Sequence, residues 1–185
     1  MDSERVRDLV ATFSGRRIGV VGDLMLDRYV WGSARRISQE APVPVVEVTR
    51  TSVAPGGAAN VARNLAALGA GAMAYGVVGE DAAGTDLLRC LTGDGVDVTG
   101  VVCDAGRVTT EKTRVIAGHQ QVVRVDTERV SPIAADVEQQ LLNRVESDLE
   151  SGAIHGVILE DYAKGTITDG VLRGVVERCR AHGVP

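Results

Sequence analysis

Two aspartates and a glycine-rich helix start are the residues whose types and spacing could bind a polar small molecule. Asp23 and Asp27 follow a short apolar run, and carboxylates at the end of such a strand are good acceptors for hydroxyl groups. Gly56 and Gly57 precede an apolar helix that presents Asn60 in its first turn. Glycines let the backbone come close to a ligand, and the N–H groups of a first helical turn are free to donate. Together these residues indicate a site for a polyhydroxylated or anionic small molecule.

The same residues also have plainer explanations. Asp23 could cap the turn after its strand, and Asp27 could be solvated. A glycine-rich helix start can arise from close packing or turn chemistry alone. Their occurrence together is what favours a binding site.

The elements that must position these residues alternate between strand and helix. Apolar runs bounded by glycine and charged residues predict buried strands, and apolar residues at helical spacing predict helices between them. The predicted strands lie at residues 18–21, 72–78, 96–103 and 157–159, and the predicted helices begin near residues 57, 82, 131 and 166. This rhythm predicts an α/β fold with a doubly wound, mainly parallel sheet.

Two segments interrupt the rhythm. Residues 24–51 are aromatic, charged and proline-containing, which predicts short strands outside the main sheet. Residues 109–117 and 121–125 flank Gly118-His119 and predict a hairpin. We expect this hairpin to pair with the strands at 43–49, and His119 to be a turn residue rather than a catalytic base.

Composition excludes several function classes. With 185 residues the chain can form one large domain, and a net charge of −5 with 3% aromatic residues argues against nucleic acid as a partner. The three cysteines lack metal-site or disulfide spacing, so we expect neither a metal nor a disulfide. The N-terminus lacks signal-peptide character and the apolar runs are too short to span a membrane, so we expect a cytoplasmic protein without membrane contacts.

The glycine-rich segment also carries a family resemblance. Its signature consists of Gly56, Gly57, Asn60, Ala62, Gly69 and Gly79. This pattern resembles the first signature of the ribokinase-like (PfkB) carbohydrate kinases. In that family the aspartate at the position of Asp27 binds sugar hydroxyls, and the residues at Gly56, Gly57 and Asn60 contact the same sugar.

Further segments narrow the resemblance to one subgroup. These segments look like those of the D-glycero-β-D-manno-heptose 7-phosphate kinases, the kinase halves of bifunctional heptose kinase/ADP-heptose synthase proteins. They are residues 22–29, 36–45, 113–115, 119–121, 124–126 and 161–165. The match runs from about residue 16 to the last residue. It implies ATP-dependent phosphorylation of the heptose phosphate at its 1-position, on the route to ADP-heptose and the lipopolysaccharide core. It also implies ATP and Mg²⁺ as cofactors of the complete domain, and a β lid formed by residues 28–51 and 108–126 that mediates a homodimer.

A sugar phosphate needs hydroxyl acceptors and cations. The acceptors would be Asp23, Asp27 and Asn60, the candidate phosphate contacts are Lys112, Arg114, Arg124 and Lys164, and the matching segments add Gln120 and Asp161 as substrate contacts. Lys164 is the preferred phosphate contact because it follows a strand end in a glycine-containing loop. Lys164 and Lys112 are the only lysines among twenty basic residues. This scarcity could mark positions that need a compact ammonium group, and chance explains it equally well. For Arg114 and Arg124 taken singly, a solvated hairpin face is the stronger alternative.

The catalytic half of the family pattern is not recognised. The resemblance places an Asn-x-x-Glu motif for Mg²⁺ and a Gly-Ala-Gly-Asp loop with the catalytic base in the second half of the fold, and we expect both motifs to be missing from these residues. We therefore expect residues 1–185 to be the N-terminal part of a carbohydrate kinase domain, with a sheet incomplete at the C-terminus, no catalytic residue and little activity alone.

Three alternatives remain at this point. The chain could be a ribokinase-like kinase for another sugar, although residues 36–45 and 119–121 argue against this. It could be a non-catalytic sugar-phosphate-binding or dimerisation module. A Rossmann dehydrogenase has little support, since Gly-x-Gly-x-x-Gly does not follow the first strand.

Overall fold

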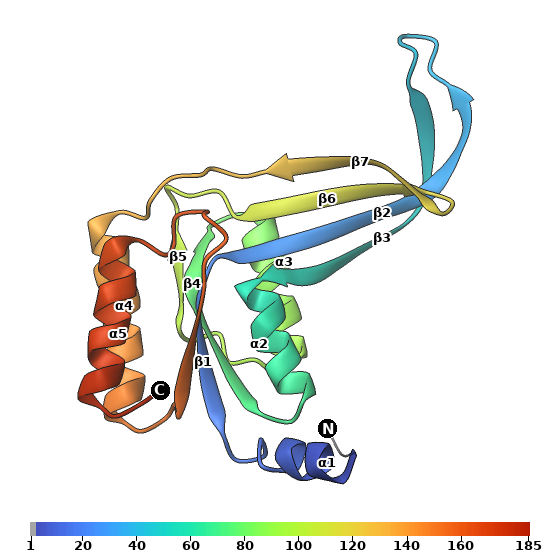
Figure 1. The fold of residues 1–185 in the computed structure, drawn as a ribbon. Coiled ribbons are helices and arrows are strands. Elements are labelled where there is room, and N and C mark those ends of the chain that lie inside the picture. Colours follow the sequence, from blue (N-terminus) through green and yellow to red (C-terminus); the bar gives the residue numbers. More distant parts are fainter. Residues whose placement is uncertain (1–2) are drawn as a thin grey trace.

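A four-stranded parallel sheet forms the centre of the molecule in the computed structural model, which describes residues 3–185 (Figure 1). The strand order is β5-β4-β1-β8. The strands are β1 (Arg17–Gly22), β4 (Gly71–Gly79), β5 (Val101–Asp104) and β8 (Gly156–Glu160). All three pairings are parallel, and their carboxyl ends therefore meet at one edge of the sheet.

Helices cover both faces of this sheet. They are α2 (Ala58–Ala67), α3 (Ala82–Gly93), α4 (Ala135–Glu150) and α5 (Asp169–Ala181), whereas α1 (Ser3–Ala11) lies at the end of the sheet where β1 begins (Figure 1). Alternate residues of one strand enter different cores, since Val20 packs with α2 and α3 whereas Val21 packs with α4 and α5. This is the doubly wound arrangement predicted from the sequence. No helix within residues 3–185 combines the length and apolar character that a bilayer crossing needs.

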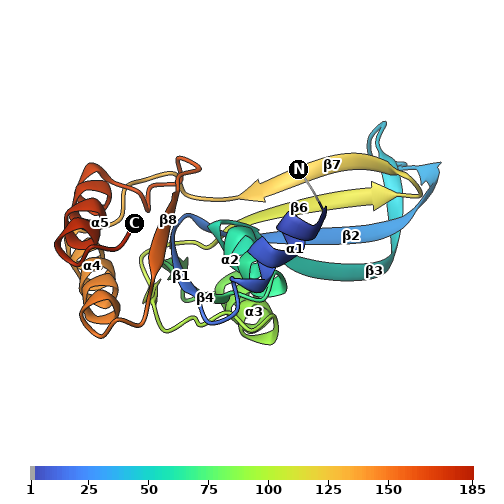
Figure 2. The same ribbon diagram turned by 60° about the horizontal axis from the view of Figure 1, so that its bottom comes forward.

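A second four-stranded sheet projects from the body as a lid (Figures 1 and 2). Its order is β3-β2-β6-β7. The strands are β2 (Leu24–Ile37), β3 (Pro44–Gly57), β6 (Thr110–Ala117) and β7 (Gln120–Thr127). They include most of the two expected lid segments and extend beyond them to Leu24 and Gly57. The lid is therefore continuous with the helix start at Gly57.

The far end of the β2–β3 hairpin bends away from the rest of the lid sheet (Figure 1). The β2–β3 register shifts between Trp31 and Gly32 and again between Ala34 and Arg36. A Cβ at Gly32 would lie 2.4 Å from the carbonyl oxygen of Glu47, so only glycine allows this close approach.

Three strand expectations were wrong. The strand expected at 96–103 is shorter, because only β5, from Val101 to Asp104, is a strand there. Before it, Asp97 forms an isolated bridge, and the segment turns at Gly100 against the ring of Tyr75. The hairpin β6–β7 pairs with β2 rather than with residues 43–49. One edge of β2 is already paired with β3, and β6 runs parallel along the other. The strands at 24–51 are also long rather than short, with fourteen residues each.

Two helix starts also differ from expectation. The helix expected from Ser131-Pro132 begins at Ala135, since the N–H of Ile133 donates to the carbonyl of Gly165 instead of entering a helix. The last helix is capped by Thr168, whose hydroxyl accepts from the N–H of Val171, and not by Thr166.

Candidate functional site

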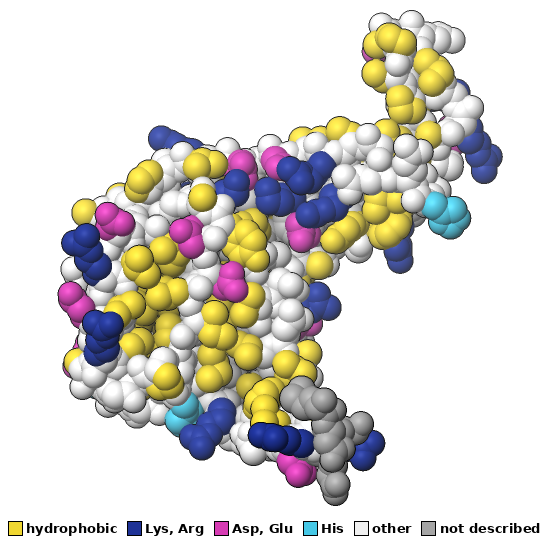
Figure 3. Space-filling view, viewed as in Figure 1, with side chains coloured by type: hydrophobic (Ala, Val, Ile, Leu, Met, Phe, Trp, Pro, Cys, Tyr) yellow, Lys and Arg dark blue, Asp and Glu magenta, His cyan; other side chains and the backbone are white. Residues whose placement is uncertain are grey.

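The charged side chains of the lid gather where it leaves the body, above the carboxyl edge of the central sheet (Figure 3). The elements meeting there are β2, β6 and β7 of the lid and the loop between β8 and α5. Open α/β sheets bind their ligands at this edge.

The glycine pair shapes one side of this place. A Cβ at Gly56 would lie 2.9 Å from Oδ2 of Asp27, so the glycine leaves the space that this carboxylate occupies. Gly57 has a φ of 56°, and a Cβ there would lie 2.5 Å from the carbonyl oxygen of Asp23. Gly57 is also the N-cap residue of α2, and Asn60 lies exposed in the first turn. The sequence motif thus has a local steric cause at both glycines.

Asp27 is paired with a cation of the neighbouring strand. Nη1 of Arg114 donates to Oδ1 of Asp27 at 2.5 Å, and the guanidinium carbon lies 5.5 Å from the centroid of the Tyr29 ring. The hydrogen bond to Asp27 raises the pKa of Arg114. Asp27 is only partly buried, so it keeps acceptor capacity facing solvent.

Asp23 is buried and hydrogen-bonded by backbone amides. Its side chain has 1% exposure, and its two carboxylate oxygens accept from the N–H groups of Tyr162, Lys164 and Thr166, each at 3.0 Å. A buried carboxylate with three donors is well satisfied. Asp23 therefore organises the loop after β8, which is close to the turn-capping alternative considered from the sequence.

A second residue holds this loop from the other side. The guanidinium of Arg107 donates to the carbonyl of Lys164 at 2.6 Å and to that of Ser131 at 3.2 Å. Burial lowers the pKa of Arg107, and the nearby charge of Asp23 opposes this shift. Arg107 and Asp23 together fix the backbone from which Lys164 extends.

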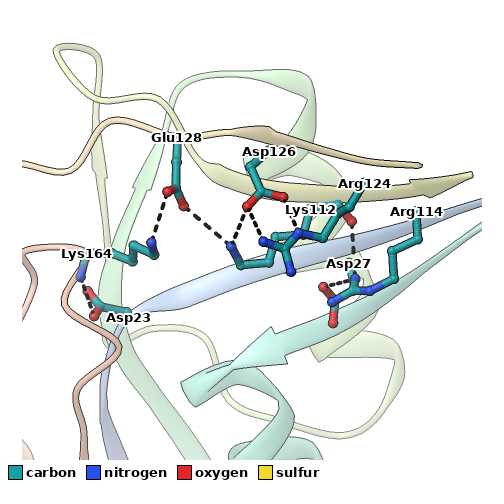
Figure 4. Close-up of polar contacts among 8 residues, drawn as sticks. All are labelled: Asp23, Asp27, Lys112, Arg114, Arg124, Asp126, Glu128 and Lys164. Carbon is teal, nitrogen blue, oxygen red and sulfur yellow. Dashed lines mark hydrogen bonds and ion pairs between the residues drawn. The ribbon is translucent and has the colours of Figure 1, made fainter. Parts of the chain in front are cut away.

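An alternating cluster of cations and carboxylates occupies the rest of the site (Figure 4). Nζ of Lys164 lies 2.9 Å from Glu128, and Nζ of Lys112 lies 3.5 Å from Glu128 and 3.2 Å from Asp126. Nε of Arg124 lies 2.8 Å from Asp126. The cluster links β6 and β7 of the lid to the loop after β8. The hydrogen bond from Lys164 lowers the pKa of Glu128, which keeps its carboxylate ionised.

Most of the candidate residues come together, and two stand apart. Figure 4 shows Asp27, Lys112, Arg114, Arg124 and Lys164 along one face of the lid and its junction with the body. Gln120 instead lies at the start of β7, opposite Ala117 at the hairpin turn. The exposed side chain of Asp161 accepts from the N–H of Ala163 within its own loop.

Sequence reasoning missed Asp126, Glu128 and Arg107 as members of the site. Asp126 and Glu128 could have been found, because they follow Arg124 at a spacing of two and a strand places such residues on one face. Arg107 lies before β6 without a distinguishing pattern, so its contact with the loop after β8 is visible only in three dimensions.

One tetrapeptide of the form Asn-x-x-Glu does occur, which corrects the expectation that the motif is missing. It is Asn143-Arg144-Val145-Glu146, in the middle of α4. Glu146 there pairs with Arg178 and His182 of the neighbouring helix end, so this tetrapeptide stabilises helix packing. Within residues 3–185 we find no group of three or more acidic, histidine or cysteine side chains arranged for a metal, and we assign no Mg²⁺ or ATP contact there.

The sequence and this geometry agree with known proteins. Residues 16–158 match the pfkB family carbohydrate kinase profile. The chain belongs to this family. This pfkB-family chain is 43% identical to the bifunctional protein HldE of Geobacter sulfurreducens over 185 residues, all of this chain and 37% of that protein. It is 47% identical to HldE of Magnetococcus marinus over 174 residues, 94% of this chain and 36% of that protein.

Solved structures show the same fold. A carbohydrate kinase from Agrobacterium tumefaciens matches this pfkB-family chain with a TM-score of 0.65 and 20% identity, over 92% of this chain and 52% of that one. Arabidopsis thaliana ribokinase, solved with ribose and ATP, matches with a TM-score of 0.62 and 21% identity over the same shares. The predicted ribokinase-like α/β fold is confirmed. The pfkB-family chain spans about half of these structures and 36–37% of the two HldE proteins.

Proposed function

We propose that residues 1–185 are the acceptor-sugar part of a kinase that phosphorylates D-glycero-β-D-manno-heptose 7-phosphate at its 1-position with ATP. The observation that carries the proposal is the single face on which Asp27, beside Gly56, lies near a cluster of three cations, Lys112, Arg124 and Lys164. A sugar phosphate offers hydroxyls to the first part of this face and an anion to the second. The sequence likeness to HldE proteins, together with the subgroup segments, supports the heptose as the sugar.

The hydroxyl side of the site depends on Asp27 and Asn60. Arg114 holds the Asp27 carboxylate through a charge-assisted hydrogen bond, which orients it before the sugar arrives. Gly56 leaves the space that this carboxylate occupies. Asp23 is not a sugar contact in this proposal, because its carboxylate is buried and already accepts three backbone N–H groups.

The phosphate side depends on the ammonium groups of Lys112 and Lys164. They come from the lid and from the loop after β8, so a phosphate between them would hold the lid against the body. Arg124 adds a further donor to the same cluster. The groups that activate the 1-hydroxyl and bind ATP with Mg²⁺ lie outside these residues in this proposal.

The lid would also carry a homodimer. Large apolar side chains are exposed on it, among them Ile37 at 62%, Val43 at 51% and Val48 at 58%. Apolar side chains on an outlying sheet are typical of a protein interface. A second copy of the chain is the partner that we propose for them.

Binding and turnover should be measured on the same protein. Isothermal titration calorimetry should show binding of heptose 7-phosphate and much weaker binding of unphosphorylated heptose, fructose and ribose. A coupled assay for ADP release should show little turnover by this chain alone. Absence of heptose 7-phosphate binding, or tighter binding of ribose or fructose, would contradict the proposed substrate. Turnover close to that of a full-length HldE protein would contradict the placement of the catalytic groups.

A further inference from the structure

Glu128 occupies the space between the two lysines of the site. Its Oε1 accepts from Nζ of Lys164 at 2.9 Å, and its Oε2 lies 3.5 Å from Nζ of Lys112. Oε2 is buried and has no hydrogen bond among the described residues, so its contact with Lys112 is ionic only. One carboxylate thus neutralises two ammonium groups that come from different parts of the fold.

The position of Glu128 allows it to leave these contacts. It is the first residue after β7, in a segment without regular structure that continues to α4. Its side chain keeps 22% exposure, and Lys112 and Lys164 keep 17% and 19%. The carboxylate can therefore turn outward into water without unfolding a strand or a helix.

The charges of the cluster make such a movement necessary for phosphate binding. Lys112, Arg124 and Lys164 are positive, and Asp126 and Glu128 are negative. A phosphate placed between the lysines with Glu128 still present would be repelled by its carboxylate at contact distance, and partial burial would strengthen this repulsion. A phosphate that takes over both ammonium groups from Glu128 is relieved of the repulsion from that carboxylate, and it carries more charge than the carboxylate that it replaces.

We infer that Glu128 is a specificity-determining residue, a built-in counter-anion that the phosphate of the substrate must displace from Lys112 and Lys164. This inference rests on the proposed function and deepens it. Displacement favours a doubly charged phosphate over singly charged anions, because a singly charged anion carries no more charge than the carboxylate that it would replace. The Glu128 contact therefore lowers the absolute affinity for anions and selects among them by charge.

Calorimetric titration with inorganic phosphate tests the competition. Glu128→Gln keeps the side-chain size and removes the charge, so phosphate should bind about tenfold more tightly to this variant than to the wild-type chain. Glu47→Gln is the matched control, since Glu47 lies on the lid and pairs with the exposed Arg36, outside the cluster of Lys112 and Lys164. Its affinity for phosphate should stay within about twofold of the wild-type value. Equal or weaker phosphate binding by Glu128→Gln would overturn the inference.

A second measurement uses only the wild-type chain. In a crystal structure with inorganic phosphate between Lys112 and Lys164, the Glu128 carboxylate should have left Nζ of Lys164. Bound phosphate with that contact intact would overturn the inference. If the wild-type chain binds heptose 7-phosphate while Glu128→Gln changes nothing, only the role of Glu128 fails. If neither protein binds phosphate or the sugar phosphate, the proposed function fails as well.

Discussion

The carboxylate of Asp23 and the backbone N–H of Lys164 lie 3.0 Å apart, although 141 positions separate the two residues in the sequence. Asp23 directly follows β1, and Lys164 belongs to the loop after β8. This contact places Lys164, the proposed phosphate contact, at the same sheet edge as Asp27. The proposed site therefore depends on a buried residue that does not need to contact the ligand.

Replacing Asp23 with asparagine should destabilise the protein and loosen the loop. The amide has one oxygen in place of two, and its NH₂ group would face N–H donors of the loop. We expect a loss of about 3 kcal/mol in the free energy of unfolding, measured by urea denaturation. Asp161→Asn is the control, because Asp161 accepts a single exposed N–H in the same loop. Asp23→Asn within about 0.5 kcal/mol of the wild type would contradict this role.

Replacing Gly56 with alanine should weaken sugar binding more than it weakens the fold. The new Cβ would lie 2.9 Å from Oδ2 of Asp27 and would push the carboxylate out of place. Calorimetry should show a loss of about tenfold in affinity for heptose 7-phosphate. In the control Gly93→Ala the new Cβ has no neighbour within 4 Å, and affinity should not change. Equal affinities of the two variants would refute the steric argument.

The pair between Arg28 and Glu111 should make stability depend on pH. Nε and Nη2 of Arg28 donate to the two oxygens of Glu111 at 2.9 and 3.1 Å, and these bonds lower the pKa of Glu111 below its ordinary value of 4.5. A lowered folded-state pKa stabilises the protein above the unfolded value, and this stabilisation is lost as the pH falls through the folded-state pKa.

Glu111→Gln should therefore be less stable than the wild type by about 1 kcal/mol at pH 7. The difference should shrink as the pH falls below 4.5, the ordinary value for this group. Urea denaturation of both proteins at pH values about one unit apart, from pH 3 to pH 7, measures this difference in stability. A difference that stays constant over this range would show that the ion pair is not its cause.

The proposed dimer can be tested by analytical ultracentrifugation. The wild-type chain should sediment with twice its mass of 19.4 kDa, and Val48→Asp should shift it towards the monomer. An aspartate in an apolar interface destabilises the dimer, because its carboxylate loses its hydration when the interface forms. Leu172→Asp is the control, since Leu172 is also exposed but lies on α5, away from the lid. A monomeric wild-type chain at all concentrations would contradict the dimer.

The fold was largely predictable, because buried strands such as 18–21 and the helix after Gly57 have clear apolar periodicity. Errors arose where tertiary contacts decide the local structure. The N–H of Ile133 donates to the carbonyl of Gly165 rather than starting a helix. Strand β6 pairs with β2, which is distant in the sequence, and the pattern of residues in β6 does not indicate its partner.

Some candidate residues could be singled out from the sequence by a distinctive type, such as Asp27, Gly56 and the rare lysines, and their binding roles stay predictions. Residues that matter through the groups they contact could not be singled out in this way. The buried position of Asp23 and the bridge formed by Glu128 depend on segments that are distant in sequence. A single sequence shows that these carboxylates exist but not which groups they meet.

The most direct test of the account is calorimetric titration of the wild-type chain and of Asp27→Asn with heptose 7-phosphate. Asp27 is the proposed charged acceptor for the sugar hydroxyls, and a hydrogen bond to such a group contributes about 1.5–3 kcal/mol. The account predicts saturable binding by the wild-type chain and an affinity on the order of 10- to 100-fold lower for Asp27→Asn. No binding by the wild-type chain, or equal binding by both proteins, would contradict it.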